Sequence, residues 1–320
     1  MAKKRMLLIG GYGVGNYGDE AILAGLLNKL PSEANKTALS HDPEETSRLH
    51  GVHSISPMEA LKDLGKFDSI VISSGLFSGH MGSWGKFVPL FGITSKAAGI
   101  DVKFEGVGIY PSTPKFLLPM IKALAIVASK ISVRDKVSRT TLTNMGINNV
   151  LLVKDLSFYM DPAPRERAIE ILEKEEIDIS KNIVGISITR MNPALSDSVT
   201  SIVHNVIKKT GNKSEILILP MCRHKKSAFE NDHLYSEEVI QRFPEIKILN
   251  GSYHPSEILS IFGILESCVC MRFHSMVFAH RMGAKMLPIP YAEKCLDFLD
   301  RVGVAPVNIE ETLKSAGGDH

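Results

Sequence analysis

An arginine and a histidine stand two residues apart at the end of an apolar run late in the chain. The run Cys268–Met271 is typical of a buried strand, and Arg272 and His274 follow it. The next residues, Ser275–Met282, have helical spacing and stop at Gly283. In open parallel sheets, ligands bind at the carboxyl ends of the strands, where helix N-termini favour anions. Arginine offers a planar fork for phosphate or carboxylate, and histidine offers a proton near neutral pH. The pair therefore predicts a site for an anionic substrate that needs acid–base help.

Cations also follow three other predicted strands in the same half of the chain. They are Arg190, Arg223 and Lys294. Because the carboxyl ends of parallel strands meet at one edge of a sheet, we expect these side chains to bind an anionic donor together with Arg272. Arg223 stands in a run of basic residues, for which a solvated loop is the alternative interpretation.

A glycine-rich loop follows the first predicted strand, with five glycines between positions 10 and 18. Gly13, Gly15 and Gly18 match the spacing of a dinucleotide fingerprint, but Gly13 comes about three residues too late to make the turn itself. No Gly-Lys-Ser/Thr follows, which excludes a Walker-type phosphate loop. Asp19 and Glu20 at the expected helix start would repel a phosphate. The loop suits a neutral, hydroxyl-rich ligand better. A nucleotide site and a purely structural turn are the alternatives.

Two shorter segments follow other predicted strands of the first half. Ser73–Gly79 is a second glycine-bearing loop, and an ordinary turn and a ligand contact are equally compatible with it. Arg134 and Asp135 end another strand, and we interpret them as a structural ion pair.

Strand-like and helical patterns alternate along the whole chain, which favours parallel sheets with crossover helices. A double-proline stretch, Asp161–Arg165, separates two series of such patterns. The simplest α/β architecture is two Rossmann-like domains facing a cleft, with domains at residues 1–165 and 166–320. The predicted strands are Arg5–Gly10, Lys36–Ser40, Asp68–Ser73, Asp101–Val107, Lys130–Val133, Val150–Val153, Asn182–Ile188, Glu215–Leu219, Ile246–Leu249, Ser267–Met271 and Lys285–Ile289. The predicted helices between them include Glu20–Leu30, Pro57–Leu64, Ser83–Ala98, Lys136–Met145, Arg167–Glu176, Ser196–Thr210, Ala228–Phe243, Pro255–Leu265 and Ser275–Met282.

Composition narrows the class of protein. The chain has 320 residues, enough for two domains, and a formal net charge of +2, which gives no general attraction to nucleic acid. The longest apolar stretch, Phe116–Val127, is too short to span a membrane, and we expect a buried or partly exposed helix there. Contact of that helix with a membrane surface is the alternative. Four cysteines without a CxxC pair favour reduced thiols in a cytoplasmic protein and give no zinc spacing.

The motifs together resemble the polysaccharide pyruvyl transferase family over nearly the whole chain. The first is Gly15-Asn16-Tyr17-Gly18-Asp19-Glu20, and the second is Val133-Arg134-Asp135. The third is Arg-x-His, a helix of small residues, a glycine and Tyr-x-x-Lys, found between Arg272 and Lys294. One departure is Ser73-Ser74-Gly75, where the family usually has a run of glycines, and it bears on the choice of acceptor rather than on the chemistry.

The resemblance implies a glycosyltransferase-B-like fold and a ketal-forming transfer of pyruvate. Phosphoenolpyruvate would be the donor, bound on the C-terminal side, and a sugar diol would be the acceptor, bound on the N-terminal side. His274 would then protonate the enol ether carbon. Gly15, Asn16, Asp19 and Glu20 would meet the acceptor. We expect no cofactor, and we assign no metal ligand.

Two other functions stay open from the sequence. A nucleotide-sugar glycosyltransferase of similar architecture would need an acidic residue late in the second domain, and Glu293 fits that part. A non-enzymatic sugar- or nucleotide-sensing protein would keep the cleft without an ionisable histidine. The acceptor sugar, its linkage, whether a lipid carries it, metal dependence and the oligomeric state do not follow from the sequence.

Overall fold

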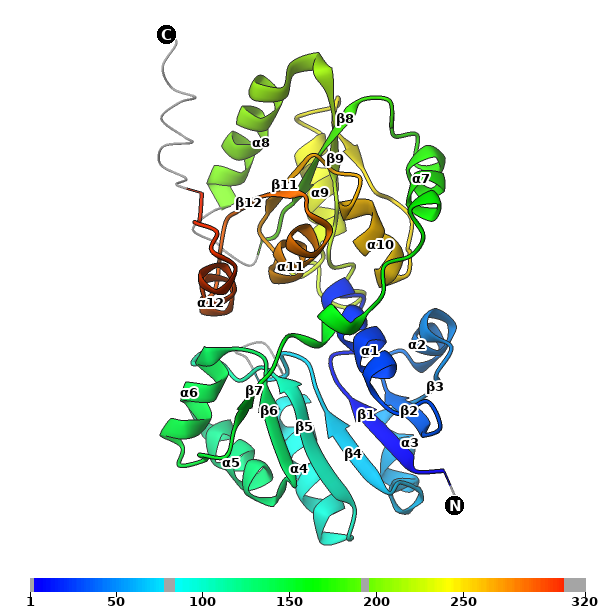
Figure 1. Cartoon of the computed structure of the whole chain (residues 1–320), viewed down its shortest axis with the longest axis vertical. Coiled ribbons are helices and arrows are strands. Elements are labelled where there is room, and N and C mark those ends of the chain that lie inside the picture. The colour runs from blue at the N-terminus through cyan, green and yellow to red at the C-terminus, as the bar shows by residue number, and fades with distance from the viewer. Residues whose placement is uncertain (1–2, 78–83, 191–195, 308–320) are drawn as a thin grey trace. The chain divides into compact units, whose positions relative to one another are not determined.

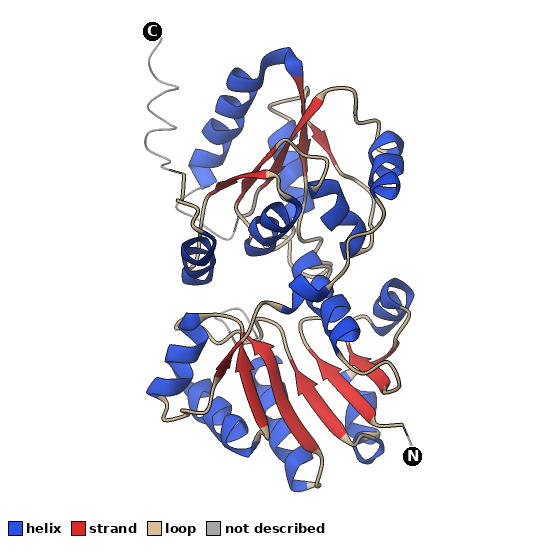
Figure 2. Cartoon of the chain, viewed as in Figure 1, coloured by secondary structure: helices blue, strands red, loops and turns tan. Residues whose placement is uncertain are grey.

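Two parallel sheets, one in each half of the chain, organise the protein. In the computed structural model, which describes residues 3–77, 84–190 and 196–307, the chain divides into two compact units. Unit 1 is Met1–Asp161 and unit 2 is Pro162–His320. In each unit helices flank a central sheet of arrows (Figures 1 and 2). The predicted α/β class with parallel sheets is confirmed.

Unit 1 contains a seven-stranded sheet with the order β3-β2-β1-β4-β5-β6-β7. All its strand pairs are parallel. The strands are β1 (Arg5–Ile9), β2 (Asn35–Leu39), β3 (His53–Ile55), β4 (Ser69–Ile72), β5 (Asp101–Val107), β6 (Lys130–Val133) and β7 (Leu151–Leu152). The helices are α1 (Tyr17–Lys29), α2 (Pro43–His50), α3 (Pro57–Lys62), α4 (Trp84–Ala97), α5 (Leu118–Val127) and α6 (Lys136–Asn144), and a short 3-10 turn, η3 (Leu156–Tyr159), ends the unit.

Apolar layers cover both faces of this sheet. On one face the α1 side chains of Ile22, Leu23 and Leu26 pack with Leu8 of β1. On the other face a larger cluster includes residues of α3, α4, α5 and α6. Burial on both faces explains why β4 reads Ser-Ile-Val-Ile without alternation, since strands in parallel sheets are covered on both sides. The loops that follow these strands are therefore attached to a sheet that is packed on both faces.

Unit 2 contains a five-stranded parallel sheet with the order β10-β9-β8-β11-β12. The strands are β8 (Asn182–Ser187), β9 (Ser214–Ile218), β10 (Lys247–Ile248), β11 (Ser267–Cys270) and β12 (Lys285–Pro288). The helices are α7 (Arg165–Lys174), α8 (Ser196–Thr210), α9 (Asp232–Ile240), α10 (Pro255–Phe262), α11 (Phe273–Met282) and α12 (Glu293–Val302). β8 lies in the middle of the sheet, so its end and the end of β11 are neighbours (Figure 1).

The predicted strands all occur, each within about two residues of its expected bounds. Sequence reasoning missed β3, α2 and α12. It also started α11 at Ser275, whereas the helix begins at Phe273. The expected helix at Ala228–Phe243 is shorter, because the Asn231 side chain accepts a bond from the backbone N–H of Leu234 and caps α9 there. Ser83, the expected first residue of α4, lies outside the described residues.

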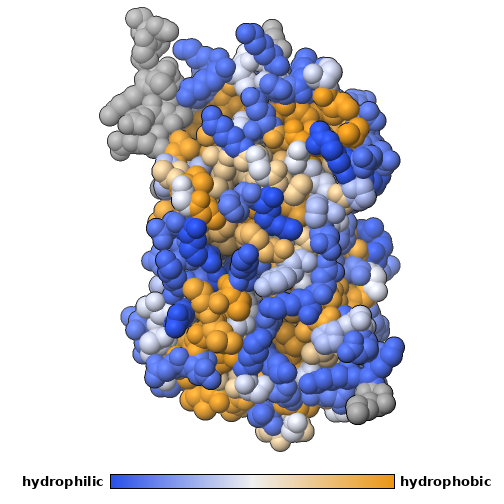
Figure 3. All heavy atoms as spheres, viewed as in Figure 1, coloured by the Kyte–Doolittle hydropathy of each residue, from blue (hydrophilic) through white to orange (hydrophobic). Residues whose placement is uncertain are grey.

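The apolar stretch before β6 forms α5 and is partly exposed, as predicted. Ile121 and Leu124 are buried, whereas Phe116 and Ile126 are more than 60% exposed. On the face seen in Figure 3, hydrophilic and hydrophobic side chains alternate over the surface. Among the described helices, none has the length and apolarity needed to cross a membrane.

Candidate functional site

The carboxyl ends of β8, β9 and β11 are connected by one buried carboxylate. Asp232, the first residue of α9, is 1% exposed. It accepts hydrogen bonds from Arg272 after β11, from the Thr189 hydroxyl after β8 and from the backbone N–H of Met221 after β9. The backbone N–H of Asp232 donates to the carbonyl of Cys222 at 2.8 Å. Three loops of one sheet edge therefore meet at this side chain.

Arg272 is the N-cap residue of α11 and is 8% exposed. Its Nε and Nη2 donate to the Asp232 carboxylate at 2.9 and 2.7 Å, and Nη2 also donates to the carbonyl of Glu230 at 3.0 Å. Burial lowers the pKa of Arg272, but the charge of Asp232 outweighs this and raises it above its ordinary value. The guanidinium therefore stays charged. Its Nε edge faces Asp232.

His274 lies in the first turn of α11 and is partly buried. Its ring contacts Phe273 and Phe278, with centroids 4.9 and 6.5 Å apart. Strand geometry through His274 would turn it to the same side as Arg272. The condition is not met, since the helix already begins at Phe273. No side chain caps the N-terminus of α11, and its first turn contains no acidic residue. The positive end of the helix dipole is thus not neutralised by its own side chains.

Arg190 also lies against α9. Its guanidinium lies 4.7 Å above the ring of Tyr235 and forms an ion pair with Glu238. Asp232, Tyr235 and Glu238 are spaced three residues apart, so one side of α9 contacts both arginines. The side chain of Arg190 remains 29% exposed, against 10% for Arg272.

Arg223 and Lys294 follow β9 and β12. Arg223 Nη2 donates to the carbonyl of Leu249, at the end of β10. The ammonium of Lys294 lies 5.4 Å from the ring of Tyr291 and 5.9 Å from that of Phe273. Arg223 lies in the loop after β9 and Lys294 in the first turn of α12, so both follow strands at the carboxyl edge of the five-stranded sheet.

The glycine-rich loop of unit 1 runs from β1 to α1 and is held from within. Gly13 and Gly15 have φ of 78° and 83°, which other residues rarely adopt. Asn16 is the N-cap of α1, and its Oδ1 accepts from Gly18 N at 2.9 Å. The helix begins only at Tyr17, so Gly13 lies in mid-loop, as the mismatch with the dinucleotide fingerprint indicated.

Glu20 fastens this loop from α1. Its Oε1 accepts from Gly13 N at 2.8 Å, and its Oε2 lies 2.8 Å from Nε2 of His50 at the end of α2. Glu20 is 4% exposed. Asp19 is half-buried and lies against Gly11, where an added Cβ would come within 2.9 Å of its carboxyl carbon. Of the residues predicted to meet an acceptor, Glu20 is thus engaged with the protein itself.

The loop after β4 lies beside the glycine-rich loop. Ser73 Oγ lies 2.5 Å from the hydroxyl of Tyr12, which is fully buried. Burial raises the pKa of Tyr12, and the charges of Asp19 and Glu20 add to this. Ser74 has φ of 72°, a left-handed conformation in which a serine is strained. The glycines usual in the family at this position would adopt it without strain. Ser78 and Gly79 of the predicted loop lie outside the described residues.

Arg134 and Asp135 form a buried ion pair, with Arg134 Nε 3.8 Å from Asp135 Oδ2, as predicted. The Arg134 guanidinium is 3% exposed, donates to Asp155 at 2.9 Å and bonds the hydroxyl of Tyr110. Asp135 accepts from Ser138 N and caps α6. The cluster joins the segments that follow β5 and β6 to the start of η3, at the carboxyl edge of the sheet.

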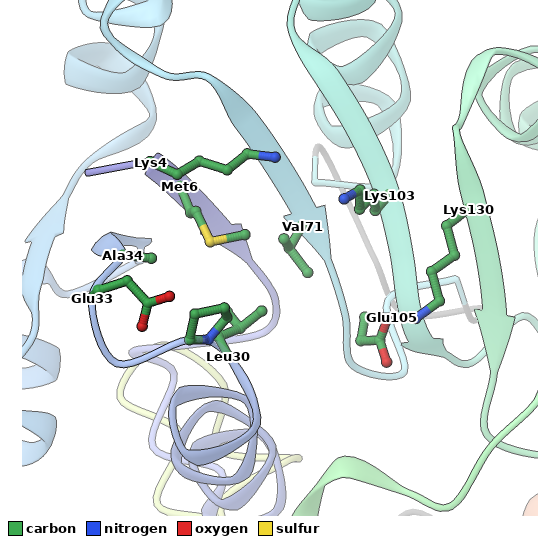
Figure 4. Close-up of a pocket in the computed structure, with 10 residues that line it drawn as sticks. Lys4, Met6, Leu30, Glu33, Ala34, Val71, Lys103, Glu105 and Lys130 are labelled. Carbon is green, nitrogen blue, oxygen red and sulfur yellow. Dashed lines mark hydrogen bonds and ion pairs between the residues drawn. The ribbon is translucent and has the colours of Figure 1, made fainter. Parts of the chain in front are cut away.

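A cavity of about 360 Å³ lies elsewhere on unit 1 (Figure 4). In it Glu105 of β5 accepts from Lys130 at 2.8 Å and from Lys29 at 2.6 Å. None of the predicted site residues lines the cavity. Its lining residues are Lys4, Met6, Leu30, Pro31, Glu33, Ala34, Val71, Lys103, Glu105 and Lys130.

Sequence reasoning missed the partners that hold the predicted site residues. His50 lies on α2, which was not predicted, although an Asp-Pro start and a glycine end mark this helix. Asp232 and Glu238 lie on a predicted helix, but no local pattern pairs them with arginines of other loops.

The chain matches a family model described as polysaccharide pyruvyl transferase over residues 16–293. The resemblance read from the motifs is confirmed. No curated protein matches the chain.

Solved structures with similar folds are distant in sequence. A Staphylococcus aureus MnaA–UDP co-structure has a TM-score of 0.65 at 10% identity, covering 99% of this chain and 87% of that chain. UDP-GlcNAc 2-epimerase from Methanocaldococcus jannaschii has 0.61 at 14% identity, covering 99% and 92%. A glycosyltransferase from Rickettsia africae has 0.58 at 12% identity, covering 99% and 88%. The glycosyltransferase-B-like fold is thereby confirmed. At these identities the likeness extends to the fold alone.

Proposed function

Because the chain belongs to the polysaccharide pyruvyl transferase family, a family of transferases, we propose that it moves a pyruvyl group from phosphoenolpyruvate to a sugar diol and forms a pyruvate ketal. The observation that carries the proposal is the start of α11. This helix follows β11 at the carboxyl edge of its sheet with no side-chain cap and no acid in its first turn, and it bears both Arg272 and His274. A helix N-terminus with an added cation attracts phosphate and carboxylate groups.

The donor has two anionic groups, and two cations contact side chains of α9. Arg272 is fixed by Asp232, and Arg190 lies over Tyr235 on the same helix. We assign the donor's phosphate and carboxylate to Arg272, Arg190 and the N–H groups of α11. In this proposal Arg223 and Lys294 add further positive charge at the carboxyl edge of the five-stranded sheet. The charge of the cations stabilises the anionic donor and the phosphate that leaves.

His274 acts as the general acid in this proposal. It gives a proton to the methylene carbon of phosphoenolpyruvate, which becomes the methyl group, and the neighbouring carbon becomes an oxocarbenium-like centre. One sugar hydroxyl attacks that carbon and returns its proton to His274. The second hydroxyl displaces phosphate, which leaves with the second proton. Two C–O bonds form, the C–O bond to phosphate breaks, and no oxidant is needed.

We assign the acceptor to the glycine-rich loop of unit 1, through Gly15, Asn16 and Asp19. Asn16 uses Oδ1 to cap α1, and its Nδ2 bonds no side chain in the part of the chain that the structure describes. The carboxylate of Asp19 can accept from a sugar hydroxyl. Glu20 contributes by holding the loop rather than by touching the sugar, because Gly13 and His50 engage both of its oxygens. We place the reaction in the cytoplasm, where the four buried cysteines would stay reduced.

A nucleotide-sugar donor is the second candidate. Its specific support is Glu293, an exposed acid in the first turn of α12, which could accept from ribose hydroxyls. The same acid weakens the N-terminus of α12 as a phosphate site, in contrast to α11.

Thermal unfolding with different donors separates the candidates. A ligand at 100 times its Kd stabilises the folded chain by about 2.7 kcal/mol. We expect phosphoenolpyruvate to raise the Tm and UDP-sugars to leave it unchanged. Phosphate release and a new ketal methyl signal, followed by NMR with a panel of saccharide diols, would identify the reaction. Stabilisation by UDP-sugars with no effect of phosphoenolpyruvate would refute the proposal in favour of a glycosyltransferase.

A further inference from the structure

The helices α4 and α5 lie side by side on one face of the seven-stranded sheet of unit 1 (Figure 1). At Gly92 of α4 an added Cβ would come within 2.4 Å of the Leu124 side chain of α5. A 3-10 turn, η2 (Lys115–Leu117), leads into α5, and the Nζ of Lys86 in α4 lies 5.4 Å from the ring centroid of Phe116 in this turn. The exposed side chains of α4, η2 and α5 therefore form one continuous surface, which we call the α4–α5 surface.

The α4–α5 surface exposes large apolar side chains. Leu90 of α4 is 54% exposed, and Phe116 and Ile126 are 61% and 64% exposed. Phe116, Pro119, Ala123 and Ile126 are all exposed and lie three or four residues apart, so they form a stripe along η2 and α5. The opposite side of α5 already packs into the core of unit 1. The stripe is therefore not part of the core, and exposed apolar patches of this kind mark interaction sites.

The charged residues of this surface are all cations. α4, η2 and α5 contain no aspartate or glutamate, and their exposed charges are Lys86, Lys96, Lys115 and Lys122. Within residues 3–77, 84–190 and 196–307, none of these four lysines forms an ion pair. The helix α3, which packs on the same face of the sheet, differs because it carries Glu59. The α4–α5 surface therefore combines exposed apolar side chains with unneutralised positive charge.

We propose that the α4–α5 surface docks on a lipid bilayer that contains anionic lipids. Such surfaces place their apolar side chains at the boundary of the acyl chains and attract anionic headgroups with lysines. Lysine stems lie along apolar groups while the ammonium stays in water, and Lys86 over Phe116 shows this arrangement. A second copy of this chain fits less well, since a symmetric contact would bring the same unpaired lysines together. The docking needs neither the donor nor the reaction proposed above.

Flotation of the full chain with lipid vesicles tests the charges. We expect binding to vesicles made of equal parts of phosphatidylglycerol and phosphatidylcholine, weakened by salt, and none to phosphatidylcholine alone. Each lysine near an anionic surface strengthens binding about fivefold, so Lys86→Gln combined with Lys122→Gln should weaken it about 25-fold. Lys62→Gln combined with Lys66→Gln removes two exposed lysines beside the acidic residues of α3 and is the matched control. This control should bind as wild type does.

A second pair of variants tests the apolar side chains. Phe116→Ser combined with Ile126→Ser should weaken binding to the anionic vesicles about 10-fold or more, because two large side chains no longer leave water. Met58→Ser combined with Leu61→Ser removes two apolar side chains of α3, 64% and 49% exposed, and should have no effect. Unchanged Tm values show that all variants are folded.

Three results would overturn the inference. The first is no binding of wild type to the anionic vesicles, or equal binding to both kinds of vesicle. The second is equal binding by the α4–α5 variants and their α3 controls. The third is retention on polyglutamate, or a dimer that the Phe116→Ser and Ile126→Ser changes abolish, without vesicle binding. Polyglutamate retention would identify an acidic protein as the partner, and the dimer would identify a second copy of this chain.

Discussion

Oε2 of Glu20 lies 2.8 Å from Nε2 of His50, and Oε1 of the same carboxylate accepts from the backbone of Gly13. The three residues come from α1, α2 and the glycine-rich loop, so one side chain fixes the shape of the loop. Glu20→Ala should remove the bonding partner of the partly buried Gly13 N–H and of the buried His50 imidazole and lower the free energy of unfolding by about 1–3 kcal/mol. Chemical denaturation measures this. Asp19→Ala serves as the neighbouring control and should cost less. A Glu20→Ala protein as stable as wild type would contradict the anchoring role.

Ser74→Gly should stabilise the protein. A left-handed conformation costs a non-glycine residue roughly 1–2 kcal/mol, and glycine adds back about 0.5–1 kcal/mol of chain entropy. We therefore expect a gain of up to about 1.5 kcal/mol. Ser73→Gly is the control, since Ser73 has no positive φ and bonds Tyr12, and it should destabilise. Denaturant midpoints compare the three proteins, and a lower midpoint for Ser74→Gly than for wild type would contradict the strain at this position.

His274→Gln tests the general acid. A positioned acid contributes about 10²–10⁴-fold in rate, so kcat for ketal formation should fall in that range. Binding of phosphoenolpyruvate, measured by calorimetry, should change little because the arginines remain. His280→Gln, at the other end of α11, is the matched control and should keep its activity. A folded His274→Gln protein with near-normal turnover would remove His274 from the mechanism.

Arg190→Ala should weaken the donor site without unfolding unit 2. Its guanidinium is partly exposed, and a lost charge-assisted bond of about 1.5–3 kcal/mol corresponds to a rise in KM of about 10- to 100-fold. Arg301→Ala, which breaks an ion pair with Asp297 within α12, is the control. Steady-state kinetics give the KM for phosphoenolpyruvate in each variant. Equal KM values in Arg190→Ala and Arg301→Ala would exclude Arg190 from donor binding.

Glu105 should make unit 1 sensitive to acid. Burial raises the pKa of Glu105, but the hydrogen bonds and charges of Lys130 and Lys29 outweigh burial and leave the pKa below its ordinary value. A carboxylate with a lower pKa in the folded state stabilises it above the unfolded value, about 4.3, and this stabilisation is lost as the pH falls through the folded value. Unfolding measured from pH 7 downward should show wild type losing more stability below about pH 4.3 than Glu105→Gln. Parallel curves would contradict the effect.

The sequence predicted the order of the elements and the edge of the sheet at which Arg272 and His274 lie. Both follow from patterns of neighbouring residues, such as apolar strands and the turns after them. β3 escaped because three residues give almost no periodic signal. The pairing of Asp232 with Arg272 could not be predicted, since it depends on how α9 packs beside β11 in three dimensions. The same is true of the contact between Glu20 and His50. The sequence assigned Glu20 to acceptor binding and gave His50 no role.

The strand order of unit 1 also bears on how the chain folds during synthesis. β1 is made first, yet it lies in the interior of the sheet, between β2 and β4. Its residue Met6 pairs with Lys36 of β2 on one side and with Ser69 of β4 on the other. At about 5–20 residues per second, Ser69 is made roughly 3–13 s after Met6. Until then the side of the apolar segment Leu7–Ile9 that later pairs with β4 has no partner strand. Unpaired strand edges can form hydrogen bonds with other chains and lead to aggregation. Aggregation during expression should therefore depend on the speed of translation through the first third of the chain, and slower synthesis would lengthen the exposure of β1.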